Sequence, residues 1–153
     1  MRPMSWRSLT PAERELGREM FGAGLDTGRI RVLALPIWLR AFVAGGSLIA
    51  WPAATLDADF AAPEVAISVQ ATFIHELTHV WQAQSGVCLP WAKLRAGDRA
   101  SAYLYDLNGG PSFAQLNIEQ QAMVVEHAFL ASRGAEAPHP AERYAALRPT
   151  WRG

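Results

Sequence analysis

The sequence is poor in cysteine, in excess charge of either sign and in long apolar runs, and each shortage excludes a class of protein. A single cysteine, Cys88, among 153 residues cannot form an internal disulfide framework, and its apolar neighbours predict a buried structural thiol. Fourteen basic residues balance fourteen acidic ones, which argues against a nucleic-acid or membrane-surface partner. Glycines and a proline interrupt the longest apolar stretch, residues 41–54, so we expect no membrane span.

The length predicts one domain over residues 1–153, and an apolar content of 50% is enough for a core. We expect the ordered core at about 9–134, followed by a tail at 135–153 that contains a possible short helix and ends loosely. The first residues lack the apolar core and cleavage site of a secretory signal. We therefore expect a cytoplasmic protein, and leave export without a cleaved signal open.

Local patterns predict an α+β fold in which strands precede two long helices. A helix should begin after Thr10, because Pro11 suits the first helical position and Glu13 completes a capping box. Alternating or apolar runs predict strands at 30–35 and 47–51, whereas 38–43 fits either a strand or a short helix. The other predicted segments are a loose lead-in at 1–8, a loop at 86–101, a short strand at 102–107, a long helix from 113 or 114 to about 133, and a short helix at 141–147.

The most informative segment reads His-Glu-Leu-Thr-His at residues 75–79, inside a helix predicted from 63 or 64 to 86. Residues four apart lie on one face of a helix, so His75 and His79 can bind the same zinc ion. Glu76 lies beside them, where it can deprotonate a zinc-bound water. The alternative is that both histidines only make hydrogen bonds within a packed helix.

A catalytic zinc site usually needs a third protein ligand. Gln82 and Ser85 exclude the class in which a glycine and a third histidine follow the motif at those positions. Glu119 is the best candidate, because it lies early in the last long helix and off its apolar stripe. The other candidates considered are His127, His139, Asp98, Asp106 and Glu126.

Four further residues have possible supporting roles. Glu126 lies two helical turns after Glu119 on the same side, where it could accept the free N–H of a ligand histidine. Gln82 either lines the cleft or caps a backbone group. Tyr103 or Tyr105 could stabilise the oxyanion, but in an alternating strand at most one faces the cleft, and both could instead be core or edge aromatics.

The motif at 75–79 with Asn-Ile-Glu-Gln-Gln-Ala at 117–122 resembles the gluzincin arrangement. The longer string at 73–82, with the two tyrosines, resembles short bacterial zincin-like proteins labelled Vgr-related, which are similar to metallopeptidase-like domains of contractile injection systems. The resemblance implies a minimal zincin-like domain: an N-terminal helix, a small mostly antiparallel sheet, the motif helix and a second helix that carries the glutamate ligand. It also implies zinc on His75, His79 and Glu119, with Glu76 as the base.

One position departs from the larger gluzincins, which carry an acidic residue four positions after the ligand glutamate. Met123 occupies that position here, and Glu126 is a possible substitute. The sequence thus favours a zinc metallopeptidase that acts on a peptide or protein. Two alternatives are an inactive zincin-like scaffold attached to a tail- or spike-type secretion assembly, and a hydrolase of another amide such as a cell-wall bond.

Overall fold

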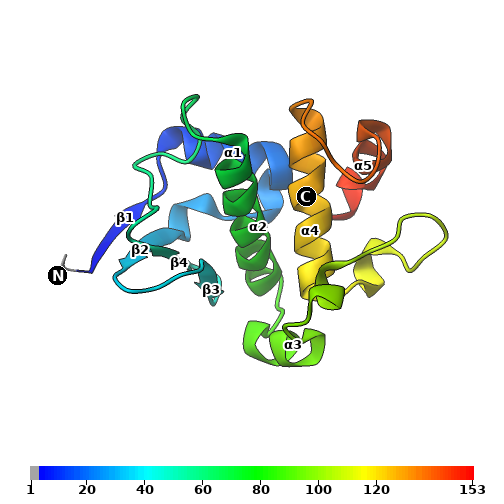
Figure 1. The fold of residues 1–153 in the computed structure, drawn as a ribbon, viewed down its shortest axis with the longest axis horizontal. Coiled ribbons are helices and arrows are strands. Elements are labelled where there is room, and N and C mark those ends of the chain that lie inside the picture. The colour runs from blue at the N-terminus through cyan, green and yellow to red at the C-terminus, as the bar shows by residue number, and fades with distance from the viewer. Residues whose placement is uncertain (1–3) are drawn as a thin grey trace.

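The computed structural model describes residues 4–153, and in it a four-stranded sheet lies beside a pair of long helices (Figure 1). The sheet has the order β1-β2-β4-β3. Its outer pairs are antiparallel and its central pair, β2 with β4, is parallel, so the sheet is mixed. The strands are β1 (Ser5–Ser8), β2 (Arg31–Leu35), β3 (Phe42–Ala44) and β4 (Leu48–Pro52). The helices are α1 (Pro11–Phe21), α2 (Ile67–Gln84), α3 (Leu89–Ala96), α4 (Ile118–Ser132) and α5 (Ala141–Leu147).

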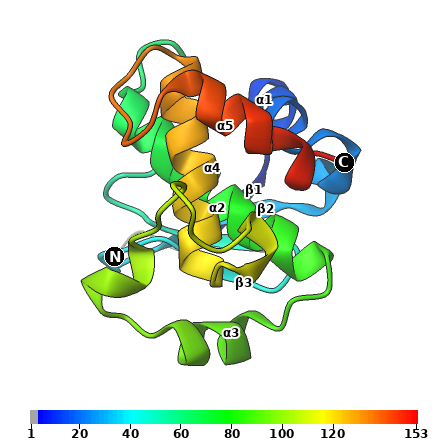
Figure 2. The same cartoon turned by 90° about the vertical axis from the view of Figure 1, so that its right-hand side faces the viewer.

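Helices α2 and α4 lie side by side (Figures 1 and 2). Their facing apolar side chains form the centre of the core. Phe73 and Leu77 from α2 and Val125 and Phe129 from α4 are completely buried there. Removal of this much apolar surface from water is the main stabilising term for such a pair. The two helices that the sequence assigned to the motif and to Glu119 are therefore packed against each other.

Both long helices begin later than the sequence suggested. Helix α4 begins at Ile118 because Asn117 is extended and forms a capping box with Gln120, while 113–115 makes a separate 3-10 turn. Helix α2 begins at Ile67, after a turn that takes up the residues following Pro63. None of the helices in residues 4–153 combines the length and the apolar character that crossing a bilayer requires.

A buried carboxylate ties the start of the chain to the body. The predicted capping box forms at Thr10, and the side chain of Glu13 also accepts two hydrogen bonds of 2.8 Å from Arg7 and one of 2.9 Å from the backbone N–H of Phe60. Arg7 lies on β1, so this network fixes residues that we expected to form a loose lead-in. That expectation is wrong for residues 5–8, because Glu13 also binds Phe60, 47 positions away in the chain, which the local sequence does not reveal. Residues 1–3 of the predicted lead-in lie outside the described residues.

Residues 86–107 also differ from the prediction. A helix, α3, replaces the first part of the expected loop, with Pro90 in its first turn and Gly97 at its end with φ of 79°. The expected strand at 102–107 is absent, because a 3-10 turn covers Ala100–Tyr103 and the described sheet contains only β1–β4. Cys88, predicted to be buried, is exposed at the start of α3.

The predicted helix at 141–147 is present as α5, but the residues after it are not loose. Trp151 is only 2% exposed, and its indole N–H donates a 3.1 Å hydrogen bond to the carbonyl of Met20. The backbone N–H of Gly153 donates to the carbonyl of Phe21. The end of the chain therefore packs against the end of α1, and burial of the large indole is the physical reason.

The Glu13 network provides a test of the fold. Replacement of Glu13 by alanine leaves Arg7 without its carboxylate and the N–H of Phe60 without an acceptor. Loss of one partner of a buried ion pair costs about 3–5 kcal/mol, so urea denaturation should show a decrease of that order in the free energy of unfolding.

Glu15→Ala is the matched control, because Glu15 lies on the same helix and its ion pair with Arg18 is exposed. Such pairs contribute at most ~1 kcal/mol. Equal losses of stability in the two variants would contradict the importance of the buried network.

Candidate metal centre

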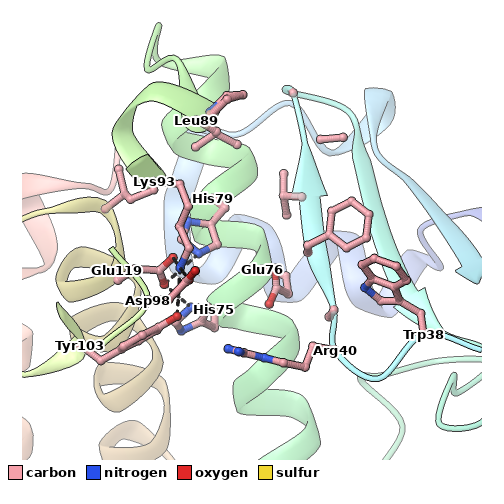
Figure 3. Close-up of a pocket in the computed structure, with 17 residues that line it drawn as sticks. Trp38, Arg40, His75, Glu76, His79, Leu89, Lys93, Asp98, Tyr103 and Glu119 are labelled. Carbon is pink, nitrogen blue, oxygen red and sulfur yellow. Dashed lines mark hydrogen bonds and ion pairs between the residues drawn. The ribbon is translucent and has the colours of Figure 1, made fainter. Parts of the chain in front are cut away.

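Three side chains from α2 and α4 converge at one point (Figure 3). Oε2 of Glu119 lies 3.3 Å from Nε2 of His75 and 3.4 Å from Nε2 of His79, and the candidate ligand atoms all lie within 4.8 Å of one another. Ligand atoms bound at ~2.0–2.1 Å to a tetrahedral zinc are about 3.4 Å apart. This zincin-like group could therefore hold a metal ion with little rearrangement.

Glu126 sets the orientation of the first histidine. Its Oε2 lies 3.0 Å from Nδ1 of His75. An ionised carboxylate only accepts hydrogen bonds, so Nδ1 carries a proton, and a metal ion that displaces the proton on Nε2 would find the lone pair of that nitrogen directed at the point where the ligand atoms meet. The structure thus puts Glu126 where the sequence suggested that a partner for a ligand histidine would lie.

Gln82 does the same for the second histidine. Its side chain is completely buried, and its amide nitrogen donates to the carbonyl of Ile118 and to Oε1 of Gln121. Both amide hydrogens are therefore engaged, and the amide oxygen faces Nδ1 of His79 at 2.9 Å. The sequence left two positions open for Gln82, one that lines the cleft and one that caps a backbone group. The structure shows the second, and Gln82 also contacts His79.

The charges around this point favour a cation. Burial acts to lower the pKa of His75, but hydrogen bonds with Glu119 and Glu126 outweigh it and raise the pKa to about 10. Burial acts to raise the pKa of Glu119, but hydrogen bonds from the histidines and from Lys93 hold it far below its usual value. The site thus already stabilises positive charge where the ligand atoms meet, and the same environment suits a metal ion.

Glu76 lies beside the three candidate ligands. Its side chain is nearly buried, with 7% of the residue exposed, and burial raises the pKa of its carboxyl group. Among residues 4–153, its Oε2 has no hydrogen-bond partner. Buried polar atoms are normally paired, so an unpaired carboxylate oxygen next to a possible metal site is suited to receive a proton from a bound water.

A cavity of about 490 Å³ opens onto these groups. Strand β3 and the loop before it form one wall, and α3 with Tyr103 forms the other (Figure 3). The residues that line it include Trp38, Arg40, Phe42, Leu89, Lys93, Asp98, Tyr103 and Ile118, together with His75, Glu76, His79 and Glu119. The candidate metal site is therefore accessible to a substrate from outside.

The two candidate tyrosines are separated by the structure. Tyr103 lines the cavity, and its hydroxyl accepts a 3.1 Å hydrogen bond from Lys93. Tyr105 lies outside the cavity, with its hydroxyl 2.6 Å from both Nδ1 of His127 and the hydroxyl of Tyr144. Tyr105 therefore holds α5 against α4, and only Tyr103 remains in place to stabilise an oxyanion.

Sequence analysis missed the contribution of α3. Lys93 donates a 2.8 Å hydrogen bond to Oε1 of Glu119, although this segment was predicted to be a loop and Lys93 was not among the candidate residues. Lys93 is the only lysine among fourteen basic residues. This composition was the one signal in the sequence that singled out Lys93. It became informative only with the structure, in which α3 lies beside the cavity.

Comparison of the sequence and of the structure with known proteins identifies the same relative, VgrG2b. No protein-family model matches the chain. A 65-residue stretch is 40% identical to the type VI secretion system spike protein VgrG2b of Pseudomonas aeruginosa and covers 40% of this chain. The chain covers only 6% of that protein.

The solved effector domain of P. aeruginosa VgrG2b is similar over nearly the whole chain. It superimposes with a TM-score of 0.73 and 26% identity, over 96% of this chain and 84% of that domain. The chain is thus homologous to the VgrG2b effector domain. The resemblance to Vgr-related proteins inferred from the motifs is confirmed to this extent.

The hydrogen bond from His79 to Gln82 can be tested through metal affinity. Gln82→Ala removes the acceptor that orients the imidazole, and loss of such a partner weakens metal binding by about 10–100-fold. Competition with a chromophoric zinc chelator measures the change, and circular dichroism checks that the variant is folded.

Gln84→Ala is the matched control. Gln84 lies on the same helix, but it is not among the residues that line the cavity, and its amide bonds to the backbone of Asp26 and Gly46 and not to a histidine. A folded Gln82→Ala protein with the zinc affinity of the Gln84→Ala protein would contradict the orienting role.

Proposed function

We propose that this chain is a zinc-dependent metallopeptidase of the gluzincin type, with His75, His79 and Glu119 as zinc ligands. The observation that carries the proposal is the convergence of these three side chains next to the unpaired carboxylate oxygen of Glu76, at the edge of an accessible cavity. A zinc ion held there would supply a Lewis acid for water and for the scissile carbonyl group.

The roles of the protein groups follow from their positions. Glu76 takes a proton from the attacking water and passes it to the leaving amine, which the raised pKa of its carboxyl group favours. The hydroxyl of Tyr103 accepts from Lys93, so its own hydrogen remains available to the oxyanion that develops in the transition state. Glu126 and Gln82 keep the imidazoles in the tautomer that binds metal.

The shape of the cavity favours an extended polypeptide as substrate. Strand β3 is at the edge of the described sheet and lines the cavity, so a peptide could add to it as a further strand. Trp38 and Phe42 lie at the rim, 51% and 40% exposed, with ring centroids 5.6 Å apart. These exposed rings suit apolar side chains of a peptide.

The homologous domain suggests a biological setting. The VgrG2b domain is an effector domain of a type VI secretion spike protein. We propose that this chain likewise acts as an effector, and that it leaves the producing cell with a spike-type assembly. An inactive scaffold is the weaker alternative, because a purely structural zinc site is usually closed by four ligands and needs no neighbouring base.

Glu76→Gln separates chemistry from metal binding. The amide cannot accept the proton, so hydrolysis should fall at least ~100-fold, while zinc content stays that of the wild type. Digestion of a broad peptide library, followed by mass spectrometry, measures the loss.

Glu64→Gln is the control, since Glu64 is exposed in the turn before α2. It should cleave as the wild type does. Cleavage by Glu76→Gln at the wild-type rate would exclude Glu76 as the base and require another proton acceptor.

A further inference from the structure

We propose that Lys93 is a positioning residue that restricts Glu119 to binding the metal ion through one oxygen. By doing so it keeps the metal ion at four ligands when water is bound. The inference rests on the metal centre of the proposed function, and it assigns a role to a helix that the motifs do not include.

The two carboxylate oxygens of Glu119 have different partners. Oε1 accepts a 2.8 Å hydrogen bond from Nζ of Lys93. Oε2 faces the imidazoles of His75 and His79 at 3.3 and 3.4 Å. Only Oε2 therefore lies among the candidate ligand atoms, and Oε1 is directed towards α3 (Figure 3).

The ammonium group of Lys93 is itself held in place. It donates to Oε1 of Glu119, lies 3.1 Å from both the hydroxyl of Tyr103 and Oδ1 of Asp98, and is 5.2 Å from the centroid of the Tyr103 ring. A lysine ammonium has three hydrogens, and these contacts provide three acceptors. These contacts direct the ammonium group towards Oε1 of Glu119, although the pair with Asp98 is exposed and contributes little.

The chemical consequence concerns the number of bonds to the metal. A carboxylate can bind with one oxygen or two, and catalytic zinc sites with three protein ligands keep a fourth position for water. If Oε1 also bound, a metal ion that kept its water would have five ligands instead of four, which makes it a weaker Lewis acid for that water. A charge-assisted hydrogen bond of 2.8 Å is about twice as strong as a neutral one, so it opposes the second metal–oxygen bond.

The choice of lysine fits this role. Thirteen of the fourteen basic residues are arginine, and the one lysine lies here. A lysine ammonium is a compact charge with three hydrogens, whereas the guanidinium of arginine is planar and pairs with both oxygens of a carboxylate. Such a pair would engage the oxygen that the metal needs, so a lysine suits the site better.

The test uses the complete chain loaded with cobalt(II), whose visible absorption is strong in four-coordinate sites and weak in five-coordinate ones. Lys93→Met keeps the length and apolar stem of the side chain but removes its charge and hydrogen bonds. The wild type should show a four-coordinate spectrum, and Lys93→Met should lose intensity as Oε1 binds the metal. Turnover should fall through kcat, with KM little changed.

Arg95→Met is the matched control, because Arg95 is exposed on the same helix and the variant loses the same charge. Its spectrum should equal that of the wild type. A wild-type spectrum from Lys93→Met, or the same loss of intensity from Arg95→Met, would overturn the inference. Failure of the wild type itself to bind cobalt or zinc would instead overturn the metal centre and with it the proposed function.

Discussion

The packing of α2 against α4 is the constraint on which the rest of the site depends. Neither helix carries a complete metal site, since α2 provides two imidazoles and α4 provides the carboxylate. Buried apolar side chains hold the helices together along their length, and Gln82 links them with a hydrogen bond to the carbonyl of Ile118. The same amide orients His79, so the contact that fixes the helix pair also fixes a candidate ligand.

The polar groups in this interface are costly to bury and are therefore almost completely paired. Glu126 and Gln82 hold the outer nitrogens of the two histidines, and Glu119 faces their inner nitrogens. A buried network is stable only when its members are satisfied. Among the described residues of this interface, the unpaired oxygen of Glu76 is the exception, and it lies in the lining of the cavity, where the proposed hydrolysis needs a proton acceptor.

Features that depend on local sequence were predictable. Helical periodicity placed His75 and His79 on one face and Glu119 off the apolar stripe of its helix, and capping residues identified the start of α1. Features that depend on distant partners were not predictable. Strand β1 relies on its pairing with β2, the buried position of Trp151 relies on α1, and α3 has no apolar periodicity strong enough to reveal it.

The metal content of the purified protein tests the central claim most directly. Elemental mass spectrometry should find about one zinc ion per chain in the wild type purified without chelators, because the three candidate ligands already lie together. His79→Ala, which loses one ligand, should retain little. A wild-type protein that carries no metal and fails to bind added zinc would contradict the account, as would a His79→Ala protein with undiminished zinc.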